Sequence, residues 1–158
     1  MVDSTCPITR RSLVALVAAT ALGLPGASAD DSVVVVHKDP NCGCCTLWVQ
    51  HLRNAGLVVR VGEAADLKTV RARLGVPAAL AACHTAEIAG YVIEGHVPVA
   101  AIQRLLSQRP NANGLAVPGM PIGSPGMEGG PPQAFTVMLF GPEGTRPYMR
   151  FIGERSVG

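Results

Sequence analysis

The sequence predicts an α/β domain with a mixed sheet, and three observations support this fold class. Residues 33–36 form a continuous β-branched run, which is typical of a strand buried on both faces. Residues 44–55 show the apolar periodicity of an amphipathic helix. Near the end of the chain, apolar segments at 135–140 and 147–152 flank the turn sequence G-P-E-G, which is typical of a C-terminal β-hairpin.

The first half of the chain is predicted to alternate strands and helices. The helix over 44–55 places four side chains on one inward stripe: Cys45, Trp48, Leu52 and Ala55. Gly56 is a suitable residue to end this helix, and residues 57–61 predict a second strand. Because a crossover between two strands of one sheet is right-handed, we expect the two strands to be parallel neighbours.

A short helix is expected after Asp66, whose side chain can cap the helix N-terminus. Its apolar residues are Leu67, Val70 and Leu74. Gly75 follows at a position that favours the end of a helix. Two shorter strands are then predicted near residues 80–84 and 90–94.

Pro98 suits the first position of a further helix, in which Ile102, Leu105 and Leu106 face inward. The segment that follows, residues 110–132, contains six glycines and six prolines among 23 residues. A stretch of this length without periodicity is typical of a functional loop or of a disordered linker.

The N-terminal residues 1–29 are expected to be a cleavable export signal. Arg10 and Arg11 supply positive charge, residues 13–24 form an apolar run, and A-S-A at 27–29 matches a small-residue cleavage site. The segment T-R-R-S-L-V also resembles a twin-arginine signal, and an ordinary secretory signal is the alternative. Since no cysteine follows the apolar run at a lipoprotein-like site, we expect a soluble periplasmic domain over residues 30–158 without a membrane anchor.

Removal of this signal would take away Asp3, Arg10 and Arg11, and so would lower the formal net charge from +2 to +1. The rest of the sequence has no basic stripe, and its few aromatic residues are too scattered to form a stacking platform. These features argue against nucleic acid as a partner.

Four cysteines remain once Cys6 has left with the signal: Cys42, Cys44, Cys45 and Cys83. Cys42 and Cys45 have C-x-x-C spacing where a strand passes into a helix, which is the position of a thioredoxin-type redox pair. The helix N-terminus favours thiolate over thiol and so lowers the cysteine pKa. Cys44 departs from the redox pattern, because a third thiol between the two would compete in thiol–disulfide exchange.

Three interpretations of this cluster compete. Structural disulfides would either join the adjacent Cys44 and Cys45 or tie Cys83 to one member of the cluster. A zinc site is disfavoured, because successive helical residues point about 100° apart and these two neighbours would converge poorly on one tetrahedral ion. Thiolates that diverge at a helix end suit a site with more than one soft metal ion and bridging sulfurs. Among metals handled outside the cytoplasm, thiolate donors select copper(I), so the sequence favours copper(I).

Methionines and histidines provide weaker candidates for ligands. Met120 and Met127 lie in the Gly/Pro-rich loop, where thioether ligation and apolar packing are equally good interpretations. His96 precedes a helix start and is the best candidate of the four histidines, for each of which a hydrogen-bonded or exposed ring is the alternative. His84 directly follows Cys83, and in a strand these two side chains would point to opposite faces and could not share an ion.

Four motifs in chain order resemble one known family. They are K-D-P-N-C-G-C-C-T-L-W at 38–48, C-H-T-A at 83–86, G-Y-V-I-E-G-H-V-P at 90–98 and G-L-A-V-P-G-M-P-I-G-S-P-G-M-E at 114–128. The chain resembles the CopG-like copper-resistance proteins over residues 33–152, nearly the whole segment after the signal. That family has long been catalogued only as a domain of unknown function.

The resemblance implies an exported bacterial protein with a thioredoxin-like three-layer fold. It also implies that the copper ligands are Cys42, Cys44, Cys45 and Cys83, and that the protein works alongside periplasmic copper-detoxification proteins. In a thioredoxin-like fold the helix over 98–108 would take the place of the final helix.

A thioredoxin-like fold further implies a cis-proline before a strand. The candidates in this sequence are Pro77, Pro118 and Pro121.

The sequence therefore predicts a periplasmic copper(I)-binding protein of copper resistance, which holds copper on the four cysteines with Met or His completing the site. The alternative is a redox enzyme, either a thiol-disulfide oxidoreductase that uses Cys42 and Cys45 or a Cu(I)/Cu(II) oxidoreductase. A structural disulfide module is the third class.

Overall fold

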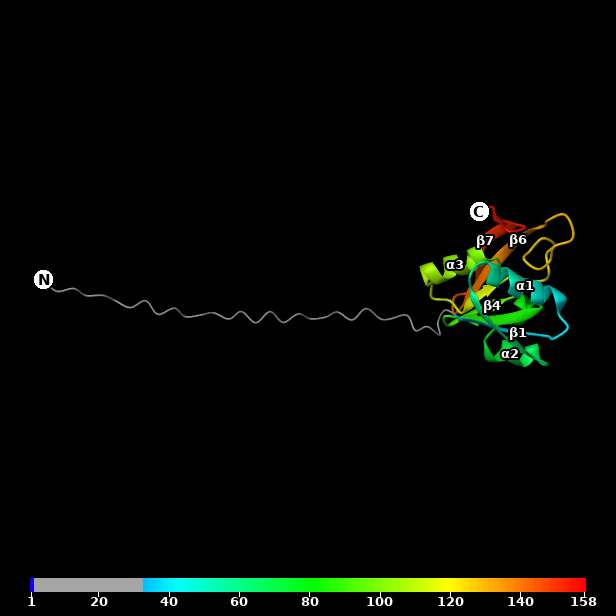
Figure 1. Ribbon diagram of the computed structural model, residues 1–158, viewed down its shortest axis with the longest axis horizontal. Coiled ribbons are helices and arrows are strands. Elements are labelled where there is room, and N and C mark those ends of the chain that lie inside the picture. Colours follow the sequence, from blue (N-terminus) through cyan, green and yellow to red (C-terminus); the bar gives the residue numbers. More distant parts are fainter. Residues whose placement is uncertain (2–32) are drawn as a thin grey trace.

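The computed structural model describes residue 1 and residues 33–158 (Figure 1). The predicted export signal and the predicted domain start at residue 30 lie outside the described residues, except for residue 1. Within residues 33–158, no helix has both the length and the apolar character needed to cross a membrane.

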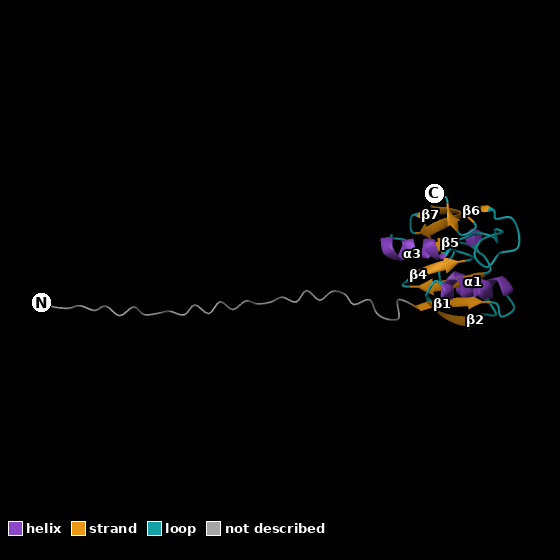
Figure 2. Ribbon diagram, turned by 45° about the horizontal axis from the view of Figure 1, so that its top comes forward, coloured by secondary structure: helices purple, strands orange, loops and turns teal. Residues whose placement is uncertain are grey.

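The described chain forms one mixed sheet of eight strands in the order β2-β1-β3-β4-β5-β6-β7-β8. The elements follow along the chain as β1 (Val33–Lys38), α1 (Gly43–Asn54), β2 (Val58–Glu63), α2 (Leu67–Arg73), the 3-10 helix η2 (Ala78–Leu80), β3 (His84–Ile88), β4 (Tyr91–Glu94), α3 (Val99–Gln108), β5 (Gly114–Ala116), β6 (Ala134–Gly141), β7 (Gly144–Ile152) and β8 (Arg155–Ser156). Figure 2 follows this order from β2 and β1 at the bottom of the molecule to β6 and β7 at the top.

Strands β1 and β2 are parallel neighbours, as the crossover argument predicts. Strand β3 pairs antiparallel with β1 and with β4, while β4 pairs in parallel with β5. The C-terminal hairpin of β6 and β7 is also confirmed. The ends of β1 and β4 and the start of β3 are thereby brought to one edge of the sheet, where α1 begins.

Side chains of neighbouring strands alternate between two core clusters. Ile93 and Leu115 belong to the larger cluster, together with residues of α1 and α3. Val92 and Ala116 belong to the smaller cluster, together with Leu80 of η2. Because successive residues of a strand point to opposite faces, α1 and α3 cover one face and the α2–η2 segment covers the other. The three-layer arrangement is therefore confirmed, and Figure 1 shows β1 between α1 and α2.

Helix boundaries agree closely with the sequence, with one correction to the stripe of α1. Asp66 caps α2 by accepting hydrogen bonds from the Lys68 and Thr69 amides. Pro98 lies one position before α3, at its N-cap. The buried stripe of α1 does not include Ala55, which is exposed beyond the end of the helix, and Val49 is buried instead.

The predicted strand over 80–84 is wrong. Leu80 ends η2 and is buried in the smaller core cluster, and β3 begins only at His84. Residues 81–83 lie outside any strand, because the Ala82 amide donates to a side chain, the Glu94 carboxylate, rather than to a neighbouring strand. This shift leaves Cys83 in the connection that leads into β3.

The segment over 110–132 is not one uninterrupted loop. Strand β5 lies inside it and pairs with β4. Gly114 makes this pairing possible, because a Cβ there would lie 1.8 Å from the Val92 carbonyl oxygen. Three residues are too few to produce a detectable alternation in the sequence.

The expectation of a cis-proline is wrong for the described residues. No peptide bond over residues 33–158 is cis, so Pro77, Pro118 and Pro121 all follow trans bonds.

Candidate metal centre

The turn between β1 and α1 presents the first cysteine at the helix N-cap. The Lys38 ammonium donates to the Asp39 carbonyl oxygen at 2.9 Å and to the Pro40 carbonyl oxygen at 3.3 Å. The Cys42 amide donates to the Asp39 carbonyl oxygen at 3.1 Å, which closes the turn. Cys42 is therefore the N-cap residue of α1, and Cys44 and Cys45 lie in the first turn of the helix.

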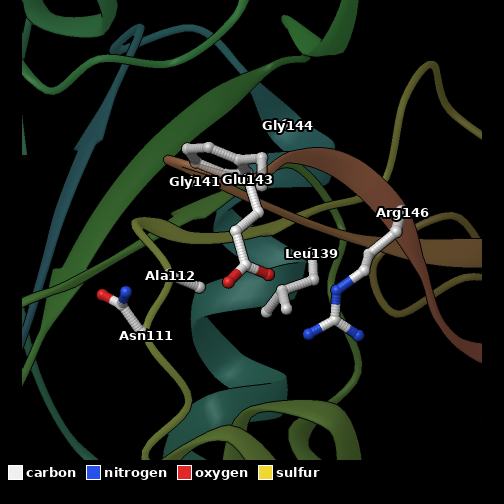
Figure 3. A pocket seen from close by; sticks show the side chains of 8 residues that line it. Asn111, Ala112, Leu139, Gly141, Glu143, Gly144 and Arg146 are labelled. Atoms are coloured by element: carbon white, nitrogen blue, oxygen red, sulfur yellow. The ribbon is translucent and has the colours of Figure 1, made fainter.

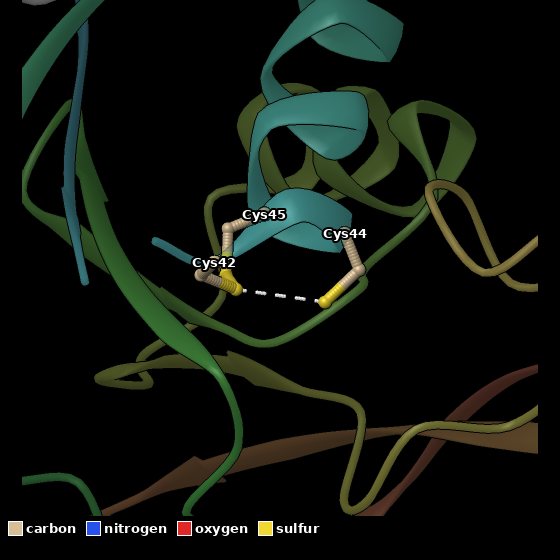
Figure 4. A group of neighbouring side chains, drawn as sticks. All are labelled: Cys42, Cys44 and Cys45. Atoms are coloured by element: carbon tan, nitrogen blue, oxygen red, sulfur yellow. Dashed lines mark hydrogen bonds between the residues drawn. A yellow bond between two sulfur atoms is a disulfide. The ribbon is translucent and has the colours of Figure 1, made fainter. Parts of the chain in front are cut away.

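Cys42 and Cys45 form a disulfide, with their Cα atoms 5.3 Å apart (Figure 4). Cys44 and Cys83 are free thiols, and both are half-buried. None of the two-disulfide arrangements considered from the sequence is therefore present. Cys44 nevertheless remains close to the bond, because its Sγ lies 3.5 Å from Cys42 Sγ.

Two groups of donor atoms in the described residues are close enough to hold a metal ion. The first consists of Cys42, Cys44 and Cys45, and the second of Cys44, Cys83 and His96; within each group the donor atoms all lie within 4.8 Å of one another. Cys44 belongs to both groups. We refer to Cys42 and Cys45 as the disulfide pair, and to Cys44, Cys83 and His96 as the open trio.

His96 enters the open trio with one ring nitrogen available. Its Nδ1 lies 2.8 Å from the Pro125 carbonyl oxygen, which can only accept, so Nδ1 carries the proton and donates it. Its Nε2 is buried and has no hydrogen-bond partner. A neutral imidazole with a free Nε2 lone pair is the form that ligates soft metals. His96, a secondary candidate in the sequence, is the histidine that the structure brings to the cysteines.

The Gly/Pro-rich loop packs directly on the start of α1. A Cβ on Gly126 would lie 2.6 Å from the Cys44 carbonyl oxygen and 2.9 Å from the Trp48 amide nitrogen. Gly126 also has a φ of +87°, which favours glycine. The loop is therefore ordered over the metal centre, and it provides the carbonyl that orients His96.

The two methionines of this loop differ in environment. Met127 directly follows Gly126 and is half-buried. The Met120 side chain is exposed, at 54% of its reference area.

Burial keeps two members of the open trio, Cys83 and His96, in their uncharged forms. Desolvation, with the Cys44 thiol as a second cause, raises the pKa of Cys83 to about 11. Desolvation also lowers the pKa of His96 below its usual value. At neutral pH the trio therefore presents a thiol at Cys83 and a neutral ring at His96, and a metal would displace the thiol proton on binding.

The burial of the His84 ring is the feature of this region that sequence reasoning missed. The ring is fully buried against the Trp48 ring, at 4.3 Å between centroids, and against the His96 ring, at 5.0 Å. Neither ring nitrogen has a hydrogen-bond partner. Desolvation and the neighbouring His96 lower its pKa to about 3, so it is neutral. No potential metal-binding group among residues 33–158 includes His84.

The other two histidines are engaged in contacts away from the cysteines. His37 Nε2 lies 2.8 Å from a carboxylate oxygen of Glu87. His51 accepts a hydrogen bond from the Val99 amide at 3.3 Å, and its Nδ1 lies 3.2 Å from a carboxylate oxygen of Glu154. Both contacts agree with the alternative to metal ligation that the sequence left open for each histidine, a hydrogen-bonded ring.

A small cavity at the β6–β7 turn is unrelated to the metal centre (Figure 3). Its volume is about 10 Å³, which is room for one water molecule. Its walls come from residues 111–112 and 139–146 and include none of the cysteines or histidines.

Two solved structures are similar to the described domain. One, described as copper resistance protein CopG, form 1, is 43% identical with a TM-score of 0.72, and the match covers 77% of this chain and 98% of that chain. The other, form 2 of copper resistance protein CopG, is 44% identical with a TM-score of 0.72, and the match covers 75% of this chain and 97% of that one. A family model described as "Protein of unknown function, DUF411" matches residues 80–127, which include Cys83 and His96. No curated protein sequence matches the chain.

Proposed function

Because the chain belongs to the family of CopG copper-resistance proteins, we propose that it binds copper(I) in the periplasm as part of copper resistance. The observation that carries this proposal is the open trio: two free thiols and a buried histidine ring, whose donor atoms all lie within 4.8 Å of one another. Thiolate and imidazole together are a donor set that suits copper(I).

The disulfide pair extends the proposed site when it is reduced. A dithiol reductant would supply two electrons and two protons, break the bond between Cys42 and Cys45 and release two thiols. Both sulfurs would then join Cys44 in the first donor group, which consists of Cys42, Cys44 and Cys45. Because Cys44 belongs to both groups, its thiolate can bridge two ions, which supports a site for more than one copper on all four cysteines.

Met120 and Met127 remain proposed supplementary thioether ligands. We rank Met127 first, because it directly follows the glycine that packs against Cys44 and is half-buried, whereas the Met120 side chain is exposed at 54%.

Export and a thioredoxin-like core belong to the same proposal. The sequence over residues 1–29 supports export to the periplasm, where other copper-handling proteins would be partners. The C-x-x-C disulfide at the junction of β1 and α1 supports a thioredoxin-like core, in which α3, on the same face as α1, would take the place of the final helix.

A redox enzyme is the second candidate, and the disulfide favours it. Cys42 and Cys45 form a C-x-x-C disulfide where β1 passes into α1, which is the position of a thioredoxin-type redox pair. In a thiol-disulfide oxidoreductase, Cys42→Ser should abolish insulin reduction while Cys44→Ser remains nearly normal. A Cu(I)/Cu(II) oxidoreductase should instead transfer electrons over many turnovers while its copper stays bound.

An anaerobic copper(I) titration tests the proposed function. The reduced wild-type chain should bind copper(I) in competition with bicinchoninate. A variant with serine at all four positions, Cys42, Cys44, Cys45 and Cys83, should lose this binding. Equal copper loading of the two proteins would end the proposal.

A further inference from the structure

Glu94 is a fully buried carboxylate two residues before His96. Its Oε1 accepts from the Arg71 Nε at 2.7 Å and from the Ala82 amide at 2.6 Å. Its Oε2 accepts from the Thr85 hydroxyl at 2.6 Å. These donors replace the hydration that the carboxylate group loses on burial.

These hydrogen bonds reach both sides of Cys83. Ala82 directly precedes this cysteine, and Thr85 follows it by two residues. Arg71 strengthens the link, since its guanidinium also donates to the Ala82 carbonyl oxygen. Both backbone polar groups of Ala82 are therefore bound by side chains rather than by a strand or helix.

The end of β4, which leads to His96, is held against the same segment. The Gly95 amide donates to the His84 carbonyl oxygen at 2.9 Å. A Cβ on Gly95 would lie 2.7 Å from the Ala82 Cβ, and its φ of +73° also requires glycine. The segments that present Cys83 and His96 are thus joined at Glu94 and Gly95.

We propose that Glu94, with Arg71, is a positioning residue that holds Cys83 toward His96 and so preorganises the open trio for copper(I). This inference rests on the proposed function. Neither residue belongs to a donor group, and both act through the backbone around Cys83. Without them, residues 81–83 have no strand pairing to fix the sulfur, because β3 begins only at His84.

The test compares two ion pairs that α2 makes with the sheet, one buried and one exposed. Arg71→Gln and Glu94→Gln each break the buried pair. Arg73→Gln breaks an exposed pair, in which Arg73 of α2 lies 3.4 Å from Glu87 of β3, and serves as the matched control. In the full chain, both buried-pair variants should bind copper(I) about 10- to 100-fold more weakly than wild type in competition with bicinchoninate. Arg73→Gln should retain the wild-type affinity.

Copper X-ray absorption separates positioning from general stability. In the disulfide-intact chain, the buried-pair variants should lose a sulfur neighbour of copper relative to wild type. A merely structural role would lower thermal stability but would leave copper affinity and the sulfur count unchanged in the folded variants, and that result overturns the inference.

Thr85→Val keeps the test decisive if Glu94→Gln fails to fold, because it removes only the bond to Oε2. Weaker copper(I) binding by this variant supports the inference, and unchanged binding overturns it. If wild type itself binds no copper(I), the proposed function fails and the inference fails with it. If wild type binds and every variant binds equally well, the inference alone fails.

Discussion

The disulfide pair and the open trio share one turn of α1 but are built in different ways. The pair joins Cys42 and Cys45, three positions apart in the sequence. The trio takes Cys44 from α1, Cys83 from the connection before β3, and His96 from the segment after β4. The pair needs only a local turn, whereas the trio needs β1, β3 and β4 to lie side by side.

This difference separates two chemical capacities. The two sulfurs of the pair are bonded to each other, and this disulfide can accept two electrons when it is reduced. The trio has two thiols outside any disulfide and one imidazole ring, so its donors need no prior reduction before they bind a metal. Copper binding by the trio and redox chemistry of the disulfide pair can therefore be tested independently, even though Cys44 belongs to the trio and also lies next to the disulfide.

The largest expected effect comes from breaking the trio. In the disulfide-intact chain, Cys83→Ser should weaken copper(I) binding by at least about 100-fold, the upper end of what loss of a supporting residue costs. The double variant Cys42→Ser with Cys45→Ser should retain tight binding of one ion, since it leaves the trio whole. Competition with bicinchoninate measures both. If the double variant lost copper as completely as Cys83→Ser, the two regions would not be separable.

Reduction of the disulfide pair should raise the number of copper(I) ions that the chain binds, rather than the affinity for the first ion. Treatment of wild type with a dithiol should raise the anaerobic copper(I) stoichiometry by at least one ion, because two further thiolates become available beside Cys44. The stoichiometry of the Cys42→Ser and Cys45→Ser double variant should not respond to the dithiol. An equal response in that variant would show that the extra ion binds elsewhere.

Gly126→Ala should disturb the loop that orients His96. The new Cβ would lie 2.6 Å from the Cys44 carbonyl oxygen, so we expect a loss of about 1–3 kcal/mol in unfolding free energy from overpacking, in addition to backbone strain. Gly119→Ala is the control, because Gly119 also has a positive φ, +73°, but a Cβ there meets nothing within 4 Å. Urea denaturation measures both variants, and equal losses would rule out the close contact as the cause.

Replacement of His84 should produce the smallest effect, which is a change in the pH dependence of the unfolding free energy. The unfolded chain takes up a proton on this imidazole below its ordinary pKa of 6.5, whereas the folded chain keeps it neutral down to about 3. The unfolded state therefore binds more protons in this window, and stability present above pH 6.5 is lost by about 1.4 kcal/mol per pH unit as the pH falls.

Replacement of this ring by His84→Phe should remove that part of the pH dependence from the copper-free protein. The difference in unfolding free energy between wild type and His84→Phe, followed from pH 7 to pH 4, is the measurement. His37→Gln, at a half-exposed histidine, is the control. A difference that does not change with pH would contradict the assignment of a buried neutral ring.

Local features of the fold were predictable from the sequence because their signals are local. The stripe of α1, the cap at Asp66 and the C-terminal hairpin each depend on residues within about a dozen positions. Strand β5 was missed because its three residues are recognised only through pairing with β4. The apolar run at 80–84 suggests a strand, but Leu80 packs as part of a 3-10 turn on the smaller core cluster.

The cysteines of the candidate metal centre were predictable from the sequence, and their geometry was less so. The spacing of Cys42 and Cys45 identified the pair, but sequence could not tell which thiols would remain free. His96 became the third member of the trio only through the Pro125 carbonyl, 29 residues away in the chain. The buried Glu94 could not be distinguished from an exposed strand residue, because its partners come from α2 and from the connection before β3.

Copper X-ray absorption on the disulfide-intact chain, combined with a count of free thiols, tests the central claim most directly. The account predicts one bound copper(I) with two sulfur neighbours and one nitrogen neighbour, and neither Cys44 nor Cys83 left as a free thiol after loading. Copper(I) that binds only after the disulfide is reduced, or that has no nitrogen neighbour, would contradict the claim that Cys44, Cys83 and His96 form a site of their own.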